Sequence, residues 1–220
     1  MRYPYISYSE NVKIKPVFQN LSGDPLIIDM SIHSSIFDDI NVRDQKGFQQ
    51  YLEKKMQGHF TWGVSSYLEN RKVVLSECPQ MVEEERFYHL GLDVIVPLGT
   101  PLFVPLASIV HETGYEAGEG NYGNYVLLQH KSNYFETFYS FYGHLSKEQL
   151  PYSGQNFKAG EQFALIGDFH ENGNWFYHTH LQVITQKGLE NGYTSKGYCS
   201  KEDLDIIDEF CPSPLPLFKR

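Results

Sequence analysis

Short apolar runs separated by glycine and proline fill the chain between residues 83 and 187. They are rich in β-branched and aromatic residues, which favour strands, and no segment with helical periodicity interrupts them. Closely spaced strands without intervening helices predict an antiparallel β-barrel or sandwich and argue against a parallel, doubly wound sheet. The runs are GLDVIVP, TPLFVPLASIVHE, GNYVLLQH, FETFYSFYGHL, EQFALIGDF and HTHLQVIT.

Two further elements are predicted in the section that precedes these strands. Residues 42–57 are expected to form a helix, because apolar side chains recur there every four residues and a glycine follows as a stop signal (Phe48, Leu52 and Met56, then Gly58). Residues 25–33 alternate enough between apolar and polar positions to predict a strand.

A short helix is predicted near the C-terminus. The segment from Ser200 to Asp203 has the form of a capping box, which marks the start of a helix. Leu204, Ile207 and Phe210 then share one helical face, so this helix is expected to pack on the strands.

These elements predict a mainly β, β-rich α+β fold. The 220 residues are enough for one large domain with a buried core. We expect residues 1–82 to pack on the core as a helix-containing extension. Residues 83–190 would form the core, and residues 191–220 would add a C-terminal segment with the short helix.

Charge and composition exclude several classes of partner. The net charge is −9 and no block of Lys and Arg occurs, so a nucleic-acid backbone or an anionic membrane surface would be repelled. Pro97, Pro101 and Pro105 interrupt the uncharged run 94–111, so we expect no membrane insertion. The N-terminus lacks the apolar stretch of a secretory signal and the three cysteines form no CxxC pair, which predicts a cytoplasmic location. The oligomeric state is left open.

The motif His89-Leu-Gly-Leu-Asp93 is the first of three that could carry chemistry. The two polar residues face one side of a strand, but in a fully extended chain they would lie about 13 Å apart. Joint metal binding therefore requires a bend, which Gly91 would permit. Taken alone, this motif is more simply interpreted as a surface histidine and a capping aspartate.

Two further histidine motifs follow. His178-Thr179-His180 projects two imidazoles from one face of a strand, so one could bind a metal beside the other. A pair of half-exposed histidines is the alternative. His144, in YGHLS, ends an aromatic run, and on its own it is best interpreted as a packed residue. The same interpretation applies to His130.

Taken in order, these motifs resemble the LytM/lysostaphin-type zinc metallopeptidases of family M23. The segment Asn121-Tyr-Gly-Asn-Tyr125 and the glycine-containing stretch 154–167 extend the resemblance, which covers about residues 88–187. It implies the lysostaphin-type fold (duplicated hybrid motif) with an antiparallel β-sheet core. It also implies hydrolysis of a peptide bond in a peptidoglycan-like or other small peptide, such as a muropeptide.

The resemblance assigns a role to each motif. His89, Asp93 and His180 would be the zinc ligands, while His144 and His178 would be catalytic, as base and oxyanion donor in an order left open. Two imidazoles and one carboxylate leave a fourth position on Zn²⁺ open, where the pKa of bound water falls from about 15.7 towards about 7. We also expect an orienting hydrogen bond to the free nitrogen of each ligand histidine.

Two features qualify the resemblance. Gln182 in HTHLQV, together with the later Cys211-Pro-Ser-Pro214, resembles a branch of the family joined to kinase-like and aminotransferase domains. That branch would fit an intracellular role.

The alternative function is a non-catalytic or latent zinc-binding regulatory module on the same scaffold. The intact set of five site residues argues against this alternative.

Overall fold

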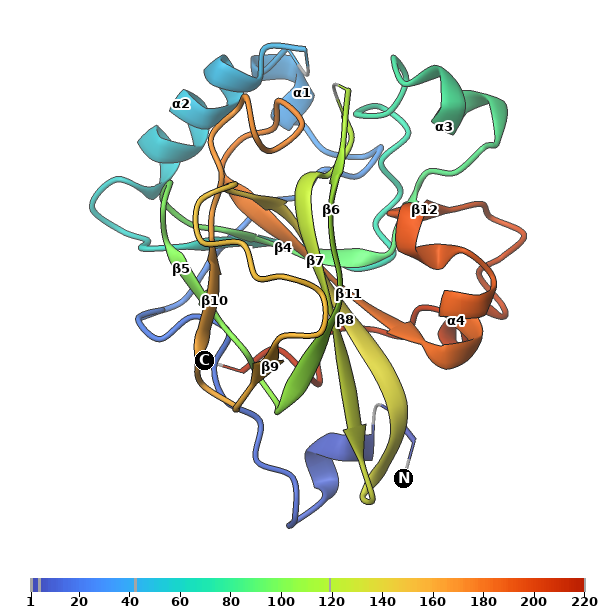
Figure 1. Cartoon of the computed structure of the whole chain (residues 1–220). Coiled ribbons are helices and arrows are strands. Elements are labelled where there is room, and N and C mark those ends of the chain that lie inside the picture. The colour runs from blue at the N-terminus through green and yellow to red at the C-terminus, as the bar shows by residue number, and fades with distance from the viewer. Residues whose placement is uncertain (1, 4, 42, 119, 220) are drawn as a thin grey trace.

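The computed structural model describes residues 2–3, 5–41, 43–118 and 120–219 (Figure 1). Its strands are β1 (Leu26–Ile27), β2 (Gly63–Ser65), β3 (Tyr88–His89), β4 (Gly91–Ile95), β5 (Pro101–Phe103), β6 (Ser108–Glu116), β7 (Gly123–Ser132), β8 (Phe135–Leu145), β9 (Asn156–Phe157), β10 (Gln162–Leu165), β11 (His178–Thr185) and β12 (Tyr198–Cys199). Its helices are α1 (Ile36–Asp39), α2 (Gln45–Met56), α3 (Pro79–Glu83) and α4 (Gln186–Glu190), with 3-10 turns η1 (Tyr5–Tyr8), η2 (Tyr193–Ser195) and η3 (Ile207–Glu209).

A mixed eight-stranded sheet organises the molecule. Its order is β1-β2-β4-β11-β8-β7-β6-β9, and the pair β1–β2 alone is parallel. The mainly β fold class is therefore confirmed. The β-barrel alternative is wrong, because the described sheet is open, with β1 and β9 at its two edges. Helices α1 and α2 lie together at one end of the molecule, at the top of Figure 1.

The central strands β4 and β11 position the site. In their antiparallel register, His180 lies directly opposite Asp93. Because side chains alternate along a strand, these two share one face, while Leu181 and Val94 turn to the other face and join an apolar core cluster. One face of the pair thus carries polar chemistry, and the other supplies packing.

The helix predicted over residues 42–57 is confirmed as α2, which begins at Gln45. Asp44 caps it by accepting a hydrogen bond from the Gly47 N–H, which sets the first turn. Val42 lies outside the described residues. The strand predicted over residues 25–33 is wrong beyond β1, because Asp29 accepts from the Ser31 N–H in a turn that ends the extended run.

The predicted C-terminal helix is reduced to the single 3-10 turn η3. The acidic half of the capping box is present, since Asp203 accepts from both the N–H and the hydroxyl of Ser200. The main chain forms separate i→i−3 turns here, from the Leu204 N–H to the Lys201 carbonyl and from the Ile206 N–H to the Asp203 carbonyl, and the carbonyls of Glu209 and Phe210 accept hydrogen bonds from Thr185. The bonds from Thr185 tie the segment to the end of β11.

Strands β1 and β2 come from residues 1–82, yet they extend the central sheet through the pairing of β2 with β4. The domain boundaries at residues 82 and 190 stay a prediction. Among the described residues, we find no helix that combines the length and apolar character needed to cross a membrane.

Buried His130 provides a test of acid stability away from the site. Its Nε2 lies 2.7 Å from Ser140 Oγ, as expected for a packed histidine, and burial lowers its pKa to about 4. Between that value and the unfolded pKa of about 6.5, the unfolded chain binds more protons, so stability decreases as the pH is lowered. The free energy of unfolding of the wild type is therefore lower at pH 4 than at pH 7. In His130→Asn this decrease is expected to be smaller by up to about 3 kcal/mol.

Urea denaturation at both pH values measures this difference. His59→Asn is the matched control, because His59 is exposed and its replacement should leave the pH dependence at the wild-type value. An equal pH dependence in wild type and His130→Asn would contradict the prediction.

Candidate metal centre

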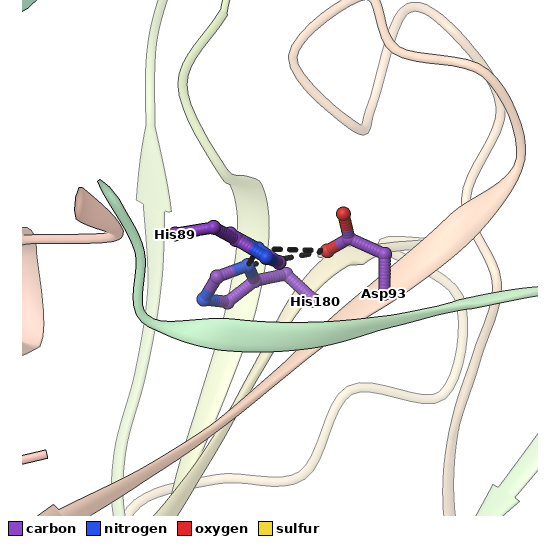
Figure 2. A group of neighbouring side chains, drawn as sticks. All are labelled: His89, Asp93 and His180. Atoms are coloured by element: carbon purple, nitrogen blue, oxygen red, sulfur yellow. Dashed lines mark hydrogen bonds and ion pairs between the residues drawn. The ribbon is translucent and has the colours of Figure 1, made fainter. Parts of the chain in front are cut away.

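Three side chains converge at the middle of the β4–β11 pair. Figure 2 shows His89 at the end of β3, Asp93 on β4 and His180 on β11 pointing toward one another. The strand is interrupted at Leu90, between β3 and β4, and His89 Nε2 comes within 3.2 Å of Asp93 Oδ1, as the predicted bend requires. The three ligand atoms lie within 4.8 Å of one another, and all three residues are buried.

The spacing of these atoms matches the edges of a coordination tetrahedron. His89 Nε2 lies 2.9 Å from His180 Nδ1, and Asp93 Oδ1 lies 3.2 Å from the first and 3.3 Å from the second. Ligand bonds of about 2.0–2.1 Å in tetrahedral geometry place neighbouring donor atoms about 3.3 Å apart. A zinc ion therefore fits this set of donors.

The opposite nitrogen of each imidazole fixes which atom faces inward. His89 Nδ1 lies 2.9 Å from the Ser66 carbonyl oxygen, so it must carry the proton and donate. His180 Nε2 lies 2.9 Å from Gln182 Oε1. The Gln182 amide is oriented by its Nε2, which donates to the carbonyls of Tyr193 and Lys196, so its oxygen accepts from His180.

Both inward nitrogens consequently present lone pairs. No proton lies between them, and they face Asp93 Oδ1, which has no hydrogen-bond partner in the described part of the chain. Three converging lone pairs repel one another in a buried site unless a cation lies between them. This donor set is what a zinc site requires. The Ser66 carbonyl and the Gln182 amide oxygen are the orienting partners that the sequence analysis predicted without identifying them.

A buried ionic network holds the other oxygen of Asp93. Oδ2 lies 2.7 Å from Arg71 Nη1 and accepts from Ser65 Oγ at 3.0 Å, while Ser65 Oγ accepts from Arg71 Nη2 at 2.6 Å. Glu69 pairs with Arg71 Nε at 2.9 Å. Burial opposes ionisation of Asp93, but the Arg71 guanidinium and the adjacent imidazoles outweigh it and hold the Asp93 pKa well below its usual value. Only Oδ1 is left for a metal.

His144 and His178 form a second pair beside the cluster. Their ring centroids are 4.3 Å apart, and His178 Nε2 lies 3.7 Å from Asp93 Oδ1. Each donates through Nδ1 to a carbonyl, His144 to Asn172 at 2.7 Å and His178 to Phe176 at 2.8 Å. Each Nε2 is thereby left as an acceptor.

His144 also occupies strained backbone. Its φ is 63°, in the left-handed region that non-glycine residues rarely adopt. The conformation is held by two main-chain hydrogen bonds, from its N–H to the Tyr122 carbonyl and from the Gly167 N–H to its own carbonyl. Strain of this kind costs roughly 1–3 kcal/mol and is concentrated at functional sites.

Burial also sets the charge state of these imidazoles. It lowers the pKa of His89 to about 3 and that of His178 to about 4, and it places the pKa of His144 well below its usual value. All three rings are therefore neutral at pH 7. Neutral imidazole is the form that ligates metals and accepts protons.

Gly91 is needed for space beside the His180 ring. A Cβ built on it would lie 2.4 Å from Cε1 of the His180 ring. Gly91→Ala is expected to displace that ring and weaken zinc binding by about 10- to 100-fold, as changes around metal ligands do. Competition against a chromophoric chelator measures the affinity.

Gly58→Ala is the matched control for this change. Gly58 has φ +78° and an unobstructed Cβ position, so its replacement strains the backbone away from the site. Stability should fall in this control while zinc affinity stays at the wild-type value. Unchanged zinc affinity in Gly91→Ala would contradict the prediction.

The structure brings together all five residues singled out in the sequence: His89, Asp93, His144, His178 and His180. Their catalytic and ligand roles stay predictions. Sequence reasoning missed Arg71, Ser65 and Glu69, for which no motif gave a signal. The part played by Gln182 could have been found, because it lies two residues after His180 on the same face of a strand.

The chain is similar to a known protein family over the segment that carries these residues. Residues 87–191 match the model of peptidase family M23. This M23-matching segment, just under half of the chain, contains all five site residues. Arg71 lies outside it. None of the proteins with curated annotation matches the chain significantly.

Solved structures of peptidases show partial similarity. A zinc-containing peptidase from Vibrio cholerae is 28% identical, over 44% of this chain and 27% of its own, with a TM-score of 0.37. The catalytic domain of lysostaphin from Staphylococcus simulans is 22% identical, over 54% of this chain and 79% of its own, with a TM-score of 0.40. The chain thus spans about a quarter of the length of the Vibrio peptidase.

Proposed function

We propose that this protein is a zinc-dependent peptidase that hydrolyses a peptide (amide) bond in a small peptide or muropeptide. The observation that carries the proposal is the convergence of three lone pairs, from His89, Asp93 and His180, beside two neutral imidazoles. The match of residues 87–191 to family M23 supports it independently. When bound, zinc supplies Lewis-acid chemistry that polarises a carbonyl and acidifies water.

The two remaining histidines supply the proton transfers. Nε2 of one imidazole accepts a proton from the attacking water as its oxygen bonds to the substrate carbonyl carbon. The same proton passes to the nitrogen of the leaving amine as the C–N bond breaks. The other imidazole lies 4.3 Å away, and the oxyanion role that the resemblance assigns to it requires a proton on its Nε2.

Metal content and turnover together test this proposal. The purified protein should bind one zinc ion per chain, and it should cleave members of a panel of oligoglycines and muropeptides that contain D-amino acids. Removal of zinc by a chelator should abolish cleavage, and addition of zinc should restore it. A zinc-loaded protein that cleaves no member of the panel would contradict the catalytic proposal. Absence of zinc binding would contradict the metal assignment.

A further inference from the structure

A cavity of about 180 Å³ lies beside the metal cluster. Asp93, His144, His178 and His180 line it on one side. Residues from outside the M23-matching region also line it, at Met30, Gln80 and Met81 before that region and at Ser195, Gly197 and Tyr198 after it. This space is large enough for several water molecules. It suits a ligand the size of a few peptide units.

The cavity lining contains a carboxylate without a cationic partner. Glu116, at the end of β6, is half-buried, and no Lys, Arg or His nitrogen in the described part of the chain lies within 4.0 Å of it. Burial raises the pKa of Glu116, the Tyr122 backbone N–H lowers it, and the nearby Glu112 carboxylate raises it further.

Two hydrogen-bond donors in the same lining also lack partners. The Tyr122 hydroxyl and the Trp175 indole N–H have no hydrogen-bond partner among the described residues, although the two side chains are only 7% and 9% exposed. Their rings lie beside the histidine pair, with centroids 5.9 Å and 6.2 Å from that of His144. Both donor atoms are fully enclosed by protein, so these two side chains shape the cavity wall through their rings.

We propose that this cavity binds a short peptide whose ammonium group pairs with Glu116. The inference rests on the peptidase function proposed above and names the substrate class. An ammonium is the compact cation that a partly desolvated carboxylate lacks. An uncharged end group would leave the half-buried Glu116 without a counter-charge.

Matched glycine peptides test the charge requirement without the complication of chirality. The probes are di- to pentaglycine with a free amine, the same peptides with an acetylated amine, and acetylated versions that carry one lysine. We expect kcat/KM for free-amine peptides to exceed that of acetylated ones at least tenfold. Recovery of the rate by the lysine would identify a side-chain ammonium, and recovery by the free amine alone would identify the α-amino group. Either outcome supports the inference.

Glu116→Gln should remove the preference for free-amine peptides. Glu112→Gln is the matched control, because it removes the same charge from the same strand but Glu112 does not line the cavity. It should retain the preference. Equal rates on free-amine and acetylated peptides in the wild type would overturn the inference and leave the peptidase proposal standing.

A binding measurement separates the two proposals if turnover is undetectable. Thermal denaturation of the zinc-loaded protein with millimolar triglycine or acetyl-triglycine should show a higher Tm only with the free amine. Glu116→Gln should abolish that shift. Such a result without hydrolysis would support the cavity assignment and contradict the peptidase proposal, while equal shifts or no shift with either peptide would overturn the cavity assignment.

Discussion

Replacement of His180 by alanine is expected to weaken zinc binding by about a hundred- to a thousandfold. Apparent binding free energies of about 10–16 kcal/mol for four-ligand zinc sites correspond to about 3–4 kcal/mol per ligand, and each 1.4 kcal/mol is about tenfold in affinity. The change also leaves Gln182 Oε1 without the ring nitrogen that it accepts from. Zinc affinity by chelator competition and metal content after dialysis both measure the loss.

His180 is the most informative of the three ligands to replace. Asp93→Ala would remove the carboxylate oxygen that lies 2.7 Å from Arg71 Nη1 in a buried ion pair. Loss of the metal could then not be told apart from loss of the fold. Replacement of an exposed histidine, His170→Ala, serves as the control and should retain wild-type zinc affinity. Retention of stoichiometric, tight zinc in His180→Ala would refute the assignment of this site.

Replacement of His144 or His178 by alanine is expected to lower kcat by about 10²–10⁴ with zinc retained. Neither residue contributes an atom to the triangle formed by His89, Asp93 and His180, so zinc content should stay at one per chain. Each supplies a neutral imidazole with Nε2 unprotonated, and alanine removes that proton acceptor. Steady-state kinetics on any cleaved peptide, together with metal analysis of the same sample, measures this separation.

The double variant shows whether the two histidines act together. Residues that work as one unit give effects far from additive, so the double variant should be little slower than the worse single variant. Loss of zinc in either single variant would move that residue into the ligand set. Retention of wild-type turnover in one of them would remove it from the mechanism.

Much of the candidate site could be predicted from the sequence because its motifs lie on strands. Side chains alternate along β11, so His178 and His180 had to share a face, and the register with β4 then placed Asp93 opposite His180. The left-handed backbone at His144 could not be predicted, because it is imposed by main-chain bonds to Tyr122 and Gly167, which lie far from it in sequence.

Outside the site, the local sequence pattern predicted one helix correctly and another incorrectly. The helix over residues 45–56 formed because its apolar face and its cap lie within one segment. The helix predicted after Ser200 is reduced to short turns, and its end is tied to β11 by bonds from Thr185 to the carbonyls of Glu209 and Phe210. Those bonds depend on a distant part of the sequence, so the local pattern could not predict them.

The sequence by itself determined the strand-rich core, the five polar residues of the site and the types of donor available to a metal. Tertiary structure alone decided which oxygen of Asp93 faces those donors, since Arg71 and Ser65 hold the other one. It also decided that Glu116 lines the same cavity as His178. The physical reason is that donor chemistry belongs to a residue type, whereas the direction of a lone pair depends on partners that only folding brings within hydrogen-bond distance.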